Sequence, residues 1–202
     1  MSVTVTTLNN GLRIATDPMD GVRTAAVGVY VNAGARHETA DDHGVAHFLE
    51  HMAFKGTERR TARGIAEEIE AVGGHLNAYT AREQTAYYAR VLADDVPLGV
   101  DLLADIVQHS VFAEVELEKE RQVIIQEIGQ AEDTPDDLVF DILQEVSFPN
   151  QTLGRPILGT PESVGGMSRD ALCNFIQRHY APRNVVFAAS GAVQHDRIAE
   201  LA

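Results

Sequence analysis

The segment from Gly44 to Lys55 constrains this chain most, because it is almost entirely apolar yet contains two histidines and a glutamate. On a helix, His47 and His51 lie four residues apart, so both imidazoles leave the same face about one turn apart. That spacing allows them to bind one Zn²⁺, with Glu50 beside the metal and not on it. The order H-x-x-E-H reverses the zinc-site motif H-E-x-x-H and has the same two ligands and general base.

The apolar flanks of this segment favour a metal site over the alternative, a solvated helix face that happens to carry two histidines and a glutamate. They predict a buried helix, and buried charged or imidazole groups cost free energy unless they are paired or bind a metal. Asp41 or Asp42 is expected to be the N-cap of this helix, which should span residues 42–54.

Composition and charge limit the possible function classes. The chain has 202 residues, of which 45% are hydrophobic and 23% charged, as expected for one globular domain. A net charge of −14 disfavours nucleic acid and anionic membranes as partners and is compatible with a cationic substrate, although such a charge more commonly serves solubility. The N-terminus lacks the features of a signal or transit peptide, and we expect a bacterial cytoplasmic protein.

Cysteine usage narrows the chemistry of any metal site. Cys173 is the only cysteine, so no disulfide can form within the chain. A zinc site would therefore use histidines and carboxylates.

Hydrophobic periodicity and turn signals predict an α+β fold. Strands are predicted over residues 3–8, 12–15, 24–33, 75–80, 84–93 and 185–190. Helices are predicted from Thr61 to the glycine pair at 73–74, around Pro97, over 114–131 and 135–146, from Ser168 to about Tyr180, and from residue 194 onward. Strands and helices alternate without a strict βαβ repeat, which favours α+β over α/β.

A catalytic zinc site needs a third protein ligand, and the predicted helix 114–131 offers two candidates. Glu120 and Glu127 are seven residues apart, so they share one face of this helix with apolar residues. Alternatively, both glutamates pair with Arg or Lys side chains on the surface, and spacing alone does not decide between the two interpretations.

Several separately spaced motifs resemble the pitrilysin superfamily of zinc peptidases, particularly processing-peptidase β-subunits and their bacterial relatives. They are residues 44–55, His-Leu-Asn-Ala-Tyr-Thr-Ala-Arg-Glu-Gln-Thr at 75–85 and Glu-Arg-Gln-Val-Ile-Ile-Gln-Glu-Ile at 120–128. Residues 153–159 and 179–184 also match, so the resemblance covers nearly the whole chain. It implies a two-layer sandwich, with a mixed, mostly antiparallel sheet and helices packed on one face.

The resemblance also implies roles for individual residues. One Zn²⁺ per chain would be held by His47, His51 and Glu127, with Glu50 as general base and Glu120 orienting a ligand. The substrate backbone would add to the strand edge at Asn77 and Ala78. Asp137 and Asp141 would dock a basic substrate residue, although a solvated helix face explains this pair almost as well.

The implied function is a zinc-dependent endopeptidase that hydrolyses unfolded peptides or presequences through a zinc-activated water, with Glu50 as the base. Residues 1–202 would form the zinc-binding N-terminal domain, truncated at its C-terminus, and a second homologous half or subunit would complete the chamber. The isolated half should be weak or inactive. The alternative is a structural or assembly subunit of the same fold, like the respiratory-complex core proteins, which commonly lack metal-site residues.

Overall fold

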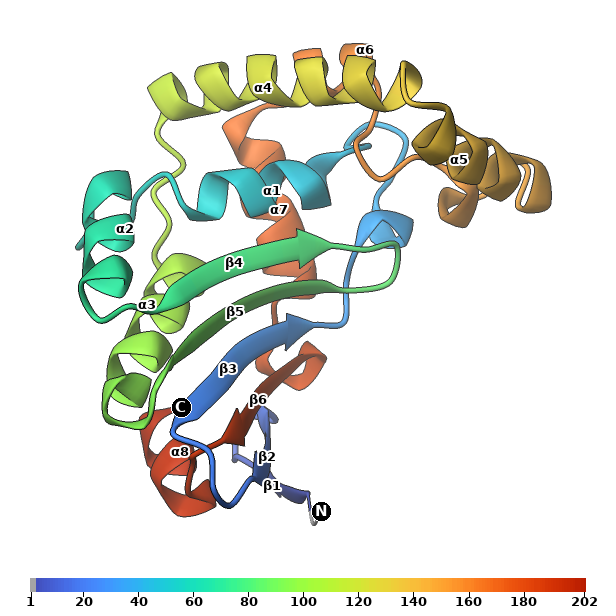
Figure 1. Ribbon diagram of the computed structural model, residues 1–202. Coiled ribbons are helices and arrows are strands. Elements are labelled where there is room, and N and C mark those ends of the chain that lie inside the picture. The colour runs from blue at the N-terminus through green and yellow to red at the C-terminus, as the bar shows by residue number, and fades with distance from the viewer. Residues whose placement is uncertain (1–2) are drawn as a thin grey trace.

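The computed structural model describes residues 3–202 and contains a six-stranded sheet with helices against one face (Figure 1). The strands are β1 (Thr4–Thr7), β2 (Arg13–Pro18), β3 (Thr24–Val31), β4 (His75–Thr80), β5 (Thr85–Leu92) and β6 (Val185–Gly191). Their order is β1-β2-β6-β3-β5-β4, and every neighbouring pair is antiparallel except β2 and β6. The predicted mixed, mostly antiparallel sheet is therefore confirmed, and β4 is one of its two edges.

The helices of the described chain include several whose ends differ from the prediction and one that was not predicted at all. They are α1 (Val45–Ala53), α2 (Ala62–Ala71), α3 (Val96–Gln108), α4 (Glu114–Glu132), α5 (Pro135–Ser147), α6 (Pro161–Gly165), α7 (Arg169–His179) and α8 (His195–Leu201). The unpredicted helix, α6, is a single short turn closed by a capping box between Thr160 and Ser163. Helix α1 is shorter than predicted at both ends, and α4 and α5 each extend one residue further.

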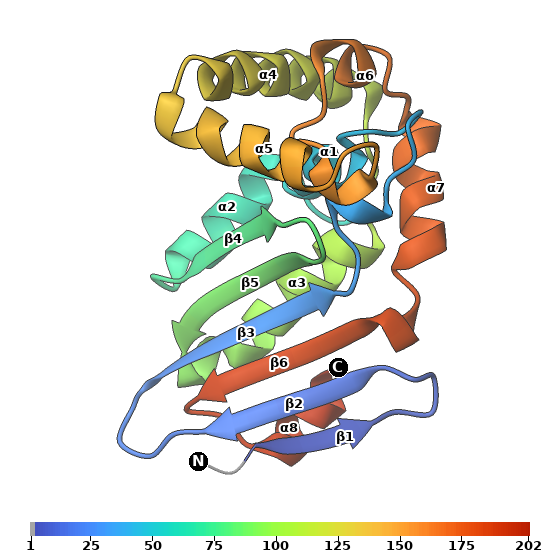
Figure 2. The same cartoon turned by 90° about the vertical axis from the view of Figure 1, so that its right-hand side faces the viewer.

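Helices cover one face of the sheet and leave the other open, and the burial pattern of β3 reflects this difference. Its residues alternate between buried Val27, Val29 and Val31 and the more exposed Ala26 and Tyr30. Helices α3 and α8 lie behind the sheet in Figure 2, while no helix of residues 3–202 covers the face turned toward the viewer. The predicted packing of helices on one face is confirmed.

Helix α1 lies between the edge strand β4 and the long helix α4 (Figure 1). Phe48, Leu49 and Met52 are almost completely buried, which confirms the predicted burial of this helix. Burying such side chains stabilises the fold by about 1.5–3 kcal/mol each. The same packing fixes the polar face of α1 opposite α4.

The predicted N-cap of α1 is wrong. Gly44 holds the N-cap position in the left-handed conformation, with φ of 91°, and a Cβ there would lie 2.9 Å from the carbonyl oxygen of Leu158. Asp42 turns away from the helix, accepts a hydrogen bond from the Thr39 hydroxyl at 2.7 Å and pairs with Arg178. The close approach of the 158–159 backbone leaves no room for a side chain at the cap.

A buried carboxylate fixes the segment that follows α1. Asp105 on α3 is fully buried and accepts hydrogen bonds from Thr57 at 2.7 Å, Arg59 at 3.0 Å and Arg60 at 2.8 Å. Burial favours a higher pKa for Asp105, but the hydrogen bonds from Arg60, Thr57 and Arg59 outweigh it and hold the pKa below its ordinary value. The ionised carboxylate therefore contributes to stability.

We expect Asp105→Asn to lower the free energy of unfolding at pH 7 by about 3 kcal/mol, because it removes the buried charge that accepts hydrogen bonds from Arg59 and Arg60. Since the pKa of Asp105 is lower in the folded than in the unfolded chain, its contribution is complete above the unfolded pKa of about 3.9 and is lost as the pH falls through the folded pKa. Urea denaturation between pH 7 and pH 2 should show the two stability curves converging in acid.

The matched control is Glu67→Gln, which breaks the exposed Glu67–Arg63 pair on α2. Its effect should be much smaller, because solvent screens an exposed pair. A stability difference for Asp105→Asn that stays constant from pH 7 to pH 2 would contradict the assignment.

Candidate metal centre

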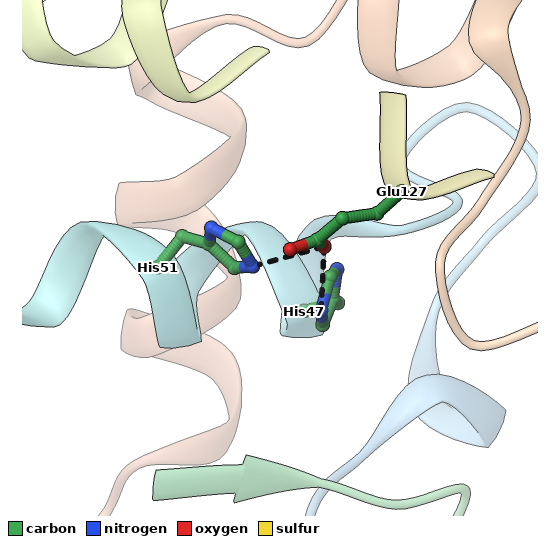
Figure 3. A group of neighbouring side chains, drawn as sticks. All are labelled: His47, His51 and Glu127. Carbon is green, nitrogen blue, oxygen red and sulfur yellow. Dashed lines mark ion pairs between the residues drawn. The ribbon is translucent and has the colours of Figure 1, made fainter. Parts of the chain in front are cut away.

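Three side chains from two helices meet at the polar face of α1. His47 and His51 project from α1, and Glu127 reaches down from α4 between them (Figure 3). Glu127 Oε2 lies 3.3 Å from His51 Nε2 and 3.8 Å from His47 Nε2. Ligand atoms of a tetrahedral zinc site with bonds of 2.0–2.1 Å lie about 3.3 Å apart. The His51–Glu127 distance matches this value, the His47–Glu127 distance is longer, and all three donor atoms lie within 4.8 Å of one another, so the three side chains could hold one Zn²⁺ after His47 moves closer.

The environment of His47 favours the neutral form that binds metal. Its side chain is largely buried, and burial together with the neighbouring His51 lowers the pKa of His47 to about 3. The two imidazole centroids are 4.6 Å apart. Nδ1 of His47 is buried and has no hydrogen-bond partner within residues 3–202. A neutral imidazole can offer its other nitrogen, Nε2, toward Glu127.

Glu120 fixes the orientation of the His51 ring. Its Oε2 lies 3.0 Å from His51 Nδ1, and its Oε1 lies 2.7 Å from Lys55 Nζ. Glu120 is only 6% exposed, whereas the Glu127 side chain is 40% exposed. A proton on Nδ1 that bonds to Glu120 leaves Nε2 facing the metal position. Glu120 therefore makes both kinds of contact that the sequence allowed. It contacts the predicted zinc ligand His51, and it pairs with Lys55.

Glu50 lies on α1 next to the end of β4. Burial raises the pKa of Glu50, while the neighbouring Thr80 and the charge of His51 act in the opposite direction. Thr80 also donates its hydroxyl to the carbonyl of Ala46 at 3.3 Å. Sequence reasoning missed Thr80, because its contact with α1 depends on how β4 and α1 pack together. A carboxyl with a raised pKa suits proton transfer near neutral pH.

The predicted substrate-binding residues lie on β4 and α5. As an edge strand, β4 can accept another strand on its free side. The N–H of Ala78 already donates to Asn77 Oδ1 at 2.9 Å, so an added strand would compete with this side chain. Asp141 pairs with Arg82 at 2.8 Å, whereas Asp137 is exposed in the first turn of α5. The assignment of substrate contacts to these four residues stays a prediction.

Comparison with known proteins gives consistent matches. Residues 13–161 match the family model described as Insulinase (Peptidase family M16). A probable mitochondrial-processing peptidase subunit beta from Arabidopsis thaliana is 50% identical over 196 residues, which is 97% of this chain and 37% of the relative. A protein named uncharacterized zinc protease from Rickettsia bellii is 47% identical over 194 residues, covering 96% of this chain and 47% of the relative.

Among solved structures, the peptidase M16 inactive domain from Pseudomonas fluorescens has a TM-score of 0.92 at 18% identity, covering 100% of this chain and 49% of that chain. This similarity concerns the fold alone.

The chain belongs to peptidase family M16. It spans 37–47% of the length of the curated relatives it matches. Within residues 3–202 we find no helix with the length and apolar character needed to cross a membrane.

We expect Glu127→Ala and His51→Ala each to abolish retention of zinc on dialysis, because two remaining ligands hold the metal weakly. Both side chains are partly exposed, so the fold should persist. Metal content after dialysis should fall from one zinc per wild-type chain to nearly none in either variant. Glu118→Ala removes an exposed carboxylate from the same helix and is the control. Unchanged zinc stoichiometry in Glu127→Ala or His51→Ala would refute the ligand set.

Proposed function

We propose that residues 1–202 form the zinc-binding N-terminal half of an M16 endopeptidase that hydrolyses unfolded peptides or presequences. The observation that carries this proposal is the meeting of donor atoms from His47, His51 and Glu127 within 4.8 Å of one another, with Glu50 next to His51 on α1. Zinc in the names of bacterial relatives gives independent support. We propose the bacterial cytoplasm as the location of this chain, in line with its similarity to bacterial proteins named zinc proteases.

The ligand side chains and Glu50 would divide the chemistry between them. When bound, Zn²⁺ would lower the pKa of a water molecule and polarise a peptide carbonyl. Glu50 accepts the proton of the attacking water and then donates it to the leaving amine, a cycle that its raised pKa favours. Glu120 keeps the His51 ring in the orientation that directs Nε2 inward.

The substrate would bind as an extended strand along β4. Backbone hydrogen bonds near Asn77 and Ala78 would hold the peptide, with the Asn77 side chain moving from the Ala78 N–H. Asp137 and Asp141 on α5 would attract a basic residue, and the negative charge of the chain supports that preference. Because Asp141 already pairs with Arg82, we assign the larger share of this attraction to Asp137.

A second homologous half or subunit would complete the enzyme. This chain spans less than half of the curated relatives it matches, and one of these is named as a subunit. The metal residues of this half lie on a partly exposed surface, with Glu127 40% exposed. We propose that the missing half covers this surface, excludes water and holds the peptide against β4, so that the isolated chain hydrolyses peptides slowly or not at all.

The second candidate is a structural or assembly subunit without peptidase activity. It is favoured by the similarity of the fold to a solved M16 domain that is described as inactive. The presence of His47, Glu50, His51 and Glu127 together in this chain favours the enzyme instead.

Glu50→Gln should reduce peptide hydrolysis by about 10³-fold in the completed enzyme while zinc remains bound, because the amide cannot accept a proton. The assay pairs the chain with the homologous second half and follows cleavage of a basic, unfolded peptide with and without a chelator. Glu118→Gln serves as the control, because it changes an exposed side chain on α4. Normal turnover by Glu50→Gln would refute the assigned role, and the absence of chelator-sensitive cleavage by the completed wild type would favour the structural subunit.

A further inference from the structure

The first turn of α1 receives a cap from a residue that lies outside the helix. The first N–H groups of a helix lack partners within it, and a side chain at the N-cap usually supplies them. Gly44 has no side chain to do so. Instead, Glu38 Oε2 accepts the N–H of Gly44 at 2.8 Å, and Glu38 Oε1 accepts the N–H of Ala46 at 2.9 Å. Both carboxylate oxygens are therefore fixed on the turn that leads directly into His47.

The segment before Glu38 is in turn bound to the end of β4. The short turn over residues 35–37 lies against the β4–β5 connection, where Ala35 donates its N–H to the carbonyl of Ala81 at 3.1 Å. Arg36 donates its N–H to the carbonyl of Arg82 at 2.8 Å. Since β4 ends at Thr80, the segment 35–38 connects the start of the metal helix to the end of the edge strand.

A second contact fixes the opposite side of the same helix start. His43 Nε2 lies 2.8 Å from the carbonyl oxygen of Pro156, and a Cβ on Gly44 would meet Gly159 Cα at 3.0 Å. The 156–159 backbone thus contacts one side of the helix start, while Glu38 accepts hydrogen bonds from the N–H groups of Gly44 and Ala46. Helix α1 has little freedom to slide or rotate at this end.

Burial of the Glu38 carboxyl group costs free energy that a purely structural contact would not require. Glu38 is 3% exposed, and both of its hydrogen bonds are to backbone N–H groups. Burial raises the pKa of Glu38 to about 8, although the bonds from Gly44 and Ala46 act against that shift. A buried carboxyl that costs stability is better explained by the geometry it imposes.

We infer that Glu38 is a positioning residue for the proposed reaction, setting the first turn of α1, and with it His47 and Glu50, relative to the peptide-binding edge of β4. This inference rests on the proposed function. A reacting carbonyl held on β4 must lie within a few tenths of an ångström of its productive position, and small misplacements in such sites cost large factors in rate. The Glu38 side chain holds the first amides of α1, and the backbone of Ala35 and Arg36 joins the same segment to the end of β4.

The test compares Glu38→Gln with wild type in the isolated chain. The glutamine has the same length, but its NH₂ group would face one of the two N–H donors and break that bond. We expect zinc affinity, measured by competition with a chromogenic chelator, to fall about tenfold. The visible absorption of the Co²⁺-substituted chain should also change in intensity, because the ligand angles at His47 change.

Two further variants make the test specific. Glu38→Asp keeps the carboxyl group but is one methylene shorter, so it should reach one N–H and give an intermediate affinity. It also provides the measurement if Glu38→Gln does not fold, as judged by circular dichroism. Ser168→Ala removes a cap of the same kind from α7, where Ser168 accepts the N–H of Ala171, and should leave zinc affinity and the Co²⁺ spectrum within twofold of wild type.

The outcomes separate this inference from the proposed function. Wild-type affinity and an unchanged Co²⁺ spectrum in a folded Glu38→Gln or Glu38→Asp chain would overturn the positioning role alone. An equal loss of affinity in Ser168→Ala would also overturn it, since the effect would then report general destabilisation. Failure of the wild-type chain to bind zinc would overturn the proposed function, and the positioning role with it.

Discussion

The need to satisfy polar groups on a buried helix governs the structure around α1. Phe48, Leu49 and Met52 hold this helix in the core, so its imidazoles and carboxylate cannot rely on bulk water. Neighbouring elements supply the partners instead. Helix α4 provides Glu120 and Glu127 to the two histidines, and β4 provides Thr80 to Glu50. These polar contacts, together with apolar packing, hold α4 and β4 on either side of α1.

Sequence reasoning succeeded where the signal is local or periodic. The strand beginning at residue 24, the helix starts at Thr61 and Ser168, and the burial of α1 were all predicted and are confirmed. The N-cap of α1 was predicted wrongly, because short-range statistics favour Asp42 whereas the actual cap comes from Glu38 through a loop. The Arg82–Asp141 pair was likewise hidden, since 59 residues separate its partners along the chain and only the fold brings them together.

Membership of family M16 defines the fold more firmly than it defines activity. A domain described as inactive shares this fold with a TM-score of 0.92, so the arrangement of sheet and helices does not by itself imply catalysis. The distinction depends on a few side chains on α1 and α4. In this chain His47, His51 and Glu127 converge, with Glu50 beside them, and this convergence supports a catalytic half over a structural subunit.

The most direct measurement is X-ray absorption at the zinc edge on the zinc-loaded chain, because it reports the ligands without requiring peptide hydrolysis. We expect four or five nitrogen and oxygen ligands at about 2.0–2.1 Å, with the outer-shell scattering of two imidazoles. His47→Ala should lose the scattering of one imidazole. A shell made of oxygen alone, or a wild-type spectrum without imidazole scattering, would contradict the assignment of the metal centre to His47, His51 and Glu127.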